Sequence, residues 1–142
     1  MDSVGGTLEL SGMKFQPETN EGANLIARQE AGRIWVGTPA GLQSFEHSVL
    51  VPWSGEVERW DAALPAELTA PHFERIAALR PEVVIYGSGP RLQFLSPALL
   101  KALIVLRIGV ETMDTAAACR TYNVLASERR RVLAALLVAP SA

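Results

Sequence analysis

The sequence is poor in cysteine and has no long apolar run. Its single cysteine, Cys119, excludes an intrachain disulfide and a cysteine-based zinc site, and it fits a reducing compartment. No apolar run approaches the ~20 residues that a membrane-spanning helix needs. The first residues are acidic and resemble neither a secretion signal nor an arginine-rich mitochondrial presequence. We therefore expect a soluble, cytoplasmic protein.

An excess of charge of either sign is also lacking. Thirteen basic and fifteen acidic residues give a formal net charge of -2, so nothing draws the chain in general to nucleic acid or to an anionic membrane. One basic cluster, Arg129–Arg131, is too short to predict nucleic-acid binding. The two histidines, His47 and His72, do not have the spacing of metal ligands. We expect His47 in the core or at a sheet edge, and His72 at the surface. We predict no metal and no cofactor.

The composition is that of a folded protein. Apolar residues make up 49% of the 142 residues and charged residues 20%, which excludes a wholly disordered chain. Residues 1–22 are rich in Gly, Ser, Glu and Thr, and predict a flexible tail with room for one short edge strand. The remaining residues, 23–139, are expected to form a single globular domain.

The first half of this domain predicts antiparallel strands. Residues 24–29 could form a strand or a helix, but a turn at Ala31-Gly32 and an apolar run at Arg33–Val36 favour a hairpin. Residues 42–53 alternate apolar and polar side chains as one strand that ends near a proline. Residues 56–60 add another short strand. We expect an antiparallel meander.

The second half alternates short apolar runs with helical patterns, which is typical of a parallel sheet with helical crossovers. Val83–Tyr86 is apolar throughout, as expected of a strand covered on both faces. Val132–Val138 is ambiguous by period and is interpreted as a third parallel strand, after Ile108–Met113. Helices are expected at 71–80, from Ser96 onward, and from Thr115 to about Glu128. The predicted fold class is mixed α/β, a meander followed by a βαβαβ unit.

Small ligands commonly bind beyond the carboxyl ends of parallel strands, and here those ends carry Gly87, Ser88 and Gly89. The loop is a poor match to a dinucleotide fingerprint because Leu92 stands where the third glycine is needed. Pro90 also removes a backbone donor that a phosphate would use. A tight turn that needs positive φ explains the glycines as simply, and we prefer it.

Other polar residues are predicted near the same strand ends. Asp114 is placed to cap the following helix and also to face the Gly87 loop. Arg91 and Arg120 could bind an anionic group that Asp114 would orient or deprotonate, and Asn123 lies on the same helical ridge as Arg120. Ser88 completes this hypothetical site for a small anionic ligand.

Cys119 shares an apolar helical arc with Ala118, Tyr122 and Ala126. A thiol in such surroundings is more simply a buried, inert residue than a nucleophile. We therefore predict no catalytic residue.

Two segments of the sequence resemble a known family. Residues 84–95 read VIYGSGPRLQFL, and residues 109–125 read GVETMDTAAACRTYNVL. The Met-Asp-Thr and Thr-Tyr-Asn-x-Leu pieces, at this distance after Gly-Ser-Gly, resemble the domain-of-unknown-function 498 family. Its eukaryotic relatives include a mitochondrial NADH dehydrogenase (complex I) assembly factor.

The resemblance implies a compact three-layer fold of β and α/β elements, no established enzymatic activity, and a strand at 132–138. One departure is visible, because this chain has Arg129-Arg130 where the family commonly has Gly-Arg, so the last helix must end differently.

Two functions remain as hypotheses. The first is a non-enzymatic interaction module whose partners are protein subunits of a respiratory complex. The second is a protein or enzyme that binds a small anionic ligand at the strand ends.

Overall fold

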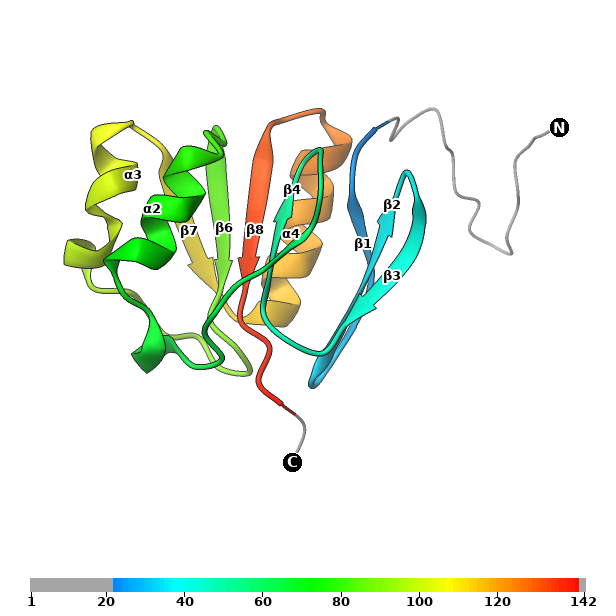
Figure 1. Cartoon of the computed structure of the whole chain (residues 1–142), viewed down its shortest axis with the longest axis horizontal. Helices are drawn as coiled ribbons and strands as arrows, with labels where there is room; N and C mark the ends of the chain where they lie inside the picture. The colour runs from blue at the N-terminus through cyan, green and yellow to red at the C-terminus, as the bar shows by residue number, and fades with distance from the viewer. Residues whose placement is uncertain (1–21, 141–142) are drawn as a thin grey trace, which may run out of the picture.

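The computed structural model describes residues 22–140 (Figure 1), so the predicted tail lies outside the described residues apart from its last residue. A first sheet contains β1 (Leu25–Glu30), β2 (Arg33–Thr38) and β3 (Gly41–Phe45) in that order, all antiparallel. The predicted hairpin is confirmed, with its turn at residues 31–32.

A second sheet of five strands follows the order β5-β4-β8-β6-β7. Its parallel part pairs β6 (Val83–Gly87) with β7 (Gly109–Met113) on one side and with β8 (Val132–Leu136) on the other. β4 (Val49–Pro52) is antiparallel to β8, and the two-residue β5 (Glu58–Arg59) forms one edge. The predicted parallel unit, including the ambiguous last strand, is confirmed.

The prediction of one strand over residues 42–53 is wrong. The chain bends after Phe45, and the two halves of the segment enter different sheets as β3 and β4. At the bend Ser48 is buried, and its hydroxyl accepts a hydrogen bond of 2.8 Å from the backbone N–H of Val138. The meander is therefore divided between two sheets, because β4 is buried on both faces and pairs with β8 instead of β3.

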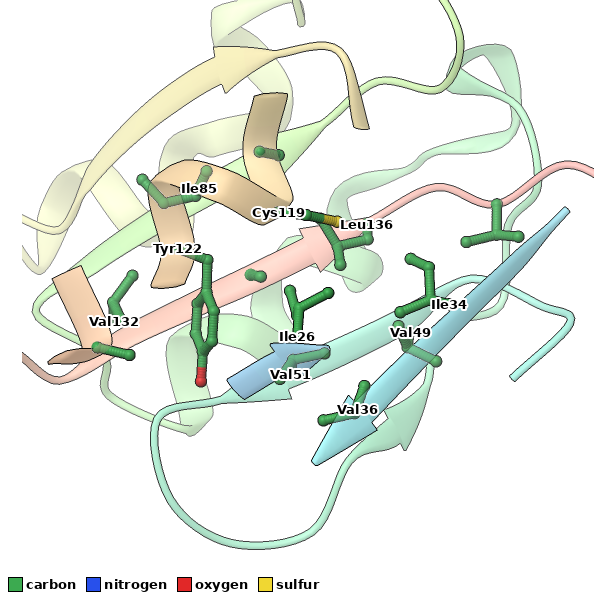
Figure 2. Close-up of a cluster of buried hydrophobic side chains, with 14 residues drawn as sticks. Ile26, Ile34, Val36, Val49, Val51, Ile85, Cys119, Tyr122, Val132 and Leu136 are labelled. Carbon is green, nitrogen blue, oxygen red and sulfur yellow. The ribbon is translucent and has the colours of Figure 1, made fainter. Parts of the chain in front are cut away.

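The helices and sheets form three layers (Figure 1). One face of the five-stranded sheet is covered by α2 (Ala70–Ala78) and α3 (Lys101–Val105), and the other by α4 (Thr115–Ser127) beside the three-stranded sheet. Figure 2 shows the core between the last two layers, where Tyr122 of α4 packs near Ile26 and Val51. Two short 3-10 segments, η2 (Pro65–Glu67) and η3 (Pro97–Leu100), precede α2 and α3. This is the predicted three-layer α/β fold.

All three α-helices of the described chain end on an arginine with positive φ: Arg80 at 54°, Arg107 at 60° and Arg129 at 64°. At the last one, the N–H of Arg130 reaches the carbonyl of Leu125 at 3.2 Å, and the N–H of Arg129 reaches that of Ala126 at 3.0 Å. This is the double hydrogen bond that normally closes a helix on glycine. The helix without a terminal glycine thus adopts the usual closure with a strained arginine in its place.

Candidate functional site

The predicted site lies where β6 and β7 end side by side. Gly87 pairs with Met113 in register, and beyond them the N–H of Ser88 donates to the carbonyl of Met113 at 2.9 Å. One residue further, the N–H of Thr115 donates to the carbonyl of Gly89 at 2.9 Å. The two loops therefore share one edge of the sheet, as the sequence predicts.

The two glycines of the loop serve its packing and its turn. A Cβ at Gly87 would lie 2.9 Å from the Cα of Thr115, so only glycine lets the first turn of α4 approach β6 this closely. Gly89 has a φ of 103°, which is the positive value that the preferred explanation of the loop requires.

Ser88 and Thr115 use their hydroxyls inside the protein. The Ser88 hydroxyl donates to the carbonyl of Arg91 at 2.7 Å and accepts from the N–H of Gln93 at 3.0 Å. The Thr115 hydroxyl donates to the carbonyl of Leu137 and accepts from the N–H of Gly89, both at 2.9 Å. Both residues are buried, so these hydroxyls hold the loop and the C-terminal segment together.

Asp114 caps α4 as predicted, because its Oδ1 accepts from the N–H of Ala117 at 2.9 Å. It also lines a hollow of about 300 Å³ with Gly89. The charged side chains among the lining residues are two carboxylates, those of Asp114 and Glu30. The rest of the lining comes from Gln29 of β1, the β1–β2 turn, Pro90, the start of α4 and residues 137–140.

The other predicted site residues do not line this hollow. Arg91 and Arg120 are exposed. Asn123 turns to the three-stranded sheet, where its Oδ1 accepts from the N–H of Ile26 and its Nδ2 donates to the carbonyl of Ile26, both at 2.8 Å. Gly89 and Asp114 are therefore brought together, whereas the amide of Asn123 holds a strand.

Tyr122 reinforces the same junction. Its hydroxyl lies 2.8 Å from the carbonyl of Asn24 and 3.1 Å from that of Pro52, and its burial raises its pKa. The side chain of Asn24 donates to the carbonyls of Pro52 and Gly55 at 2.8 and 2.9 Å. Tyr122 and Asn123, which are neighbours in α4, thus hold the first sheet against the second. The sequence pattern does not predict this role.

Cys119 is 5% exposed, and burial raises the pKa of its thiol to about 12. The thiol is therefore protonated at neutral pH and a poor nucleophile, as predicted. No three His, Cys, Asp or Glu side chains gather as metal ligands within residues 22–140.

His72 is partly exposed, and its ring packs against that of Trp60, with ring centroids 6.0 Å apart. Its Nδ1 accepts from the N–H of Thr69 at 3.0 Å, and its Nε2 donates to the carbonyl of Asp61 at 2.7 Å. His72 thereby stabilises the start of α2.

The model of a family described as "Protein of unknown function (DUF498/DUF598)" matches residues 26–137. The chain belongs to this family. Among curated relatives, NADH dehydrogenase [ubiquinone] 1 alpha subcomplex assembly factor 3 of Bos taurus is 35% identical over 102 residues, which are 70% of this chain. The chain spans about half, 54%, of that relative's length.

Bacterial proteins are similar as well. An uncharacterized protein of Rhodobacter capsulatus is 40% identical over 96 residues, covering 63% of this chain and 77% of that protein. The crystal structure of a Bordetella parapertussis protein superposes with a TM-score of 0.73 at 38% identity, covering 82% of this chain and 96% of that one. The DUF498/DUF598 chain has no helix within residues 22–140 that is long and apolar enough to cross a membrane.

Proposed function

We propose that this chain is a non-enzymatic interaction module that assists the assembly of a membrane respiratory complex. The observation that carries the proposal is its 35% identity over 102 residues to an assembly factor of NADH dehydrogenase. The site supports it, because the Ser88, Thr115 and Asn123 side chains are occupied by structural hydrogen bonds and the Cys119 thiol is protonated.

The partner surface that fits this proposal is the connection between β6 and β7, residues 88–108. Contiguous large apolar side chains that remain in solvent mark protein interaction sites. Ile104, Val105 and Leu106 are consecutive at the end of α3, whereas Leu92 and Phe94 follow the carboxyl end of β6. Five of the eight exposed large apolar side chains of the described chain belong to this connection, and Phe94 and Val105 are the most exposed at 74% and 69%. The other three in the connection are Leu92, Ile104 and Leu106.

Affinity capture from cells that contain the chain naturally tests the proposal. The full chain is expected to recover NADH dehydrogenase subunits, and the double variant Phe94→Ser/Val105→Ser to lose most of them, because exposed apolar anchors dominate such interfaces. Leu42→Ser is the matched control, since Leu42 is 66% exposed but lies on β3. Consistent recovery of no respiratory subunit by the full chain would contradict the assembly role.

A second function, the binding of a small molecule at the strand ends, is favoured by the hollow beside Gly89 and Asp114. Its two carboxylates suit a ligand with a positively charged group, whereas an anion would need Arg91 or Arg120 from outside the lining. A thermal-shift screen of metabolites is expected to show a cationic hit that stabilises the full chain but not Glu30→Gln, a variant that leaves the α4 cap intact. Equal stabilisation of the variant would remove this function.

A further inference from the structure

A second hollow lies at the opposite end of the parallel strands, where the chain passes from α2 into β6 and from α3 into β7. It has a volume of about 360 Å³. Three arginines from three separate connections line it, namely Arg80, Arg107 and Arg131. Because β6, β7 and β8 are parallel neighbours, their starting ends bring these side chains to the same edge of the sheet.

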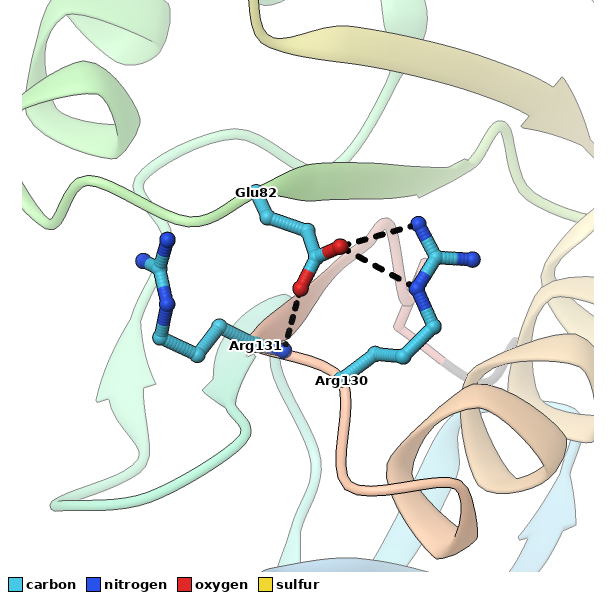
Figure 3. A network of polar contacts seen from close by, with 3 residues as sticks. All are labelled: Glu82, Arg130 and Arg131. Carbon is cyan, nitrogen blue, oxygen red and sulfur yellow. Dashed lines mark hydrogen bonds and ion pairs between the residues drawn. The ribbon is translucent and has the colours of Figure 1, made fainter.

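The charge of this hollow is positive. Its one acidic lining residue is Glu82, whose Oε2 accepts from the Arg130 guanidinium at 3.1 and 3.2 Å and whose Oε1 accepts from the N–H of Arg131 at 3.0 Å (Figure 3). The hydrogen bond from the Arg131 backbone, aided by Arg130, lowers the pKa of Glu82. Arg130 therefore balances the carboxylate, and three guanidinium groups remain for the hollow.

The arginines are positioned in an unusual way. Arg80 and Arg107 both hold positive φ, a conformation in which glycine or asparagine would avoid strain. The Arg131 side chain extends to the other side of Glu82 from Arg130 (Figure 3), and its guanidinium donates to the carbonyl of Arg80 at 2.6 Å. A cation at a helix end interacts well with the helix dipole from any position in the last turn, so the dipole does not explain why the strained positions carry arginine.

We propose that this hollow binds a phosphate group. A guanidinium presents paired N–H donors that match two phosphate oxygens, and three guanidinium groups from separate connections line this one hollow. A volume of about 360 Å³ is within the range of small-molecule sites. The hollow is separate from the one beside Asp114, but it shares residues 106–108 with the proposed interaction surface. Phosphate binding does not require the assembly role, because pyrophosphate binding is measured on the chain alone, without any protein partner.

A titration of the isotopically labelled full chain with pyrophosphate, followed by amide NMR shifts at constant ionic strength, tests the site. Saturable shifts are expected at Glu82, Arg107 and Arg131. Arg107→Gly is expected to weaken binding at least tenfold while raising the midpoint of thermal unfolding, because glycine relieves the positive φ as it removes the charge. Loss of binding would then be separated from loss of folding.

Arg59→Gln is the matched control, since Arg59 is also exposed but lies on β5, beside the far end of β8. The affinity of this variant for pyrophosphate should equal that of the natural chain. The proposal is overturned by the absence of saturable shifts, by undiminished binding in Arg107→Gly, or by hexaglutamate binding as tightly as pyrophosphate.

A second experiment, with lipid vesicles, distinguishes a lipid headgroup from a soluble phosphate compound as the ligand. Sedimentation with vesicles of phosphatidylcholine containing phosphatidylglycerol, lost in Arg107→Gly, supports the site with a lipid headgroup as its ligand. Pyrophosphate binding without sedimentation supports it with a soluble phosphate compound.

Discussion

Replacing Asn123 by alanine is expected to lower the free energy of unfolding by about 2–3 kcal/mol. The Asn123 amide bonds both backbone groups of Ile26 at 2.8 Å, and Ile26 is only 6% exposed. Alanine leaves that N–H and that carbonyl without a partner in a place that water reaches poorly, and each such group costs roughly 1–3 kcal/mol. Urea unfolding followed by circular dichroism measures the change.

The expected loss has a local signature. The Ile26 amide should exchange with solvent faster in Asn123→Ala, relative to amides of β6, because its hydrogen-bond acceptor is gone. Ser127→Ala is the control on the same helix, where an exposed hydroxyl donates to the carbonyl of Val124 at 2.8 Å, and a change below about 0.5 kcal/mol is expected. A similarly small change in Asn123→Ala would mean that the amide does not fasten the first sheet.

Asn123 also shows why the site was harder to predict than the fold. The helical ridge identifies it correctly as a polar residue beside an apolar arc, but its partner Ile26 is 97 residues away in the chain. Helical spacing is a local pattern and contains no information about which element packs against the ridge. In the sequence, a polar side chain that hydrogen-bonds a distant backbone group therefore looks the same as one that binds a ligand.

Whether a signal is local also explains why β6 and α4 were predicted correctly and the strand over residues 42–53 was not. β6 and the start of α4 could be predicted because their signals, an apolar run before glycine and a capping Asp114, are local. The division of residues 42–53 could not, because the alternation keeps its phase through the bend: Phe45 and Val49 both pack in or against the same core cluster. The choice of β8 as the partner of β4 depends on residues more than 80 positions later in the chain.

The sequence predicts glycine at position 87 to be structurally required, but the reason in the structure differs from the predicted one. The sequence offered a ligand loop or a turn with positive φ, and the positive φ belongs to Gly89. Gly87 itself is required by the approach of α4, because a Cβ there would lie 2.9 Å from the Thr115 Cα and 3.1 Å from the Ala118 Cβ.

Gly87→Ala is therefore expected to lower the free energy of unfolding by about 2–3 kcal/mol, at the upper end of the usual effect of overpacking. The helix cannot easily retreat from the added methyl group, since Thr115 is tied to the carbonyls of Gly89 and Leu137. Urea unfolding measures the loss. Gly109→Ala is the matched control on the neighbouring strand, where a Cβ would have no heavy atom within 4 Å, and it should be neutral or raise stability by up to about 1 kcal/mol.

A double variant separates the contact with the Ala118 methyl group from the contacts with Thr115. Gly87→Ala/Ala118→Gly removes the contact at 3.1 Å but leaves those with the Thr115 Cα at 2.9 Å and Oγ1 at 3.0 Å, so it should recover none of the stability lost in Gly87→Ala. The added glycine inside α4 should lower stability by roughly another 1 kcal/mol. Recovery in the double variant would assign the strain to the Ala118 methyl group, and an unchanged stability of Gly87→Ala would show that α4 is free to shift at its first turn.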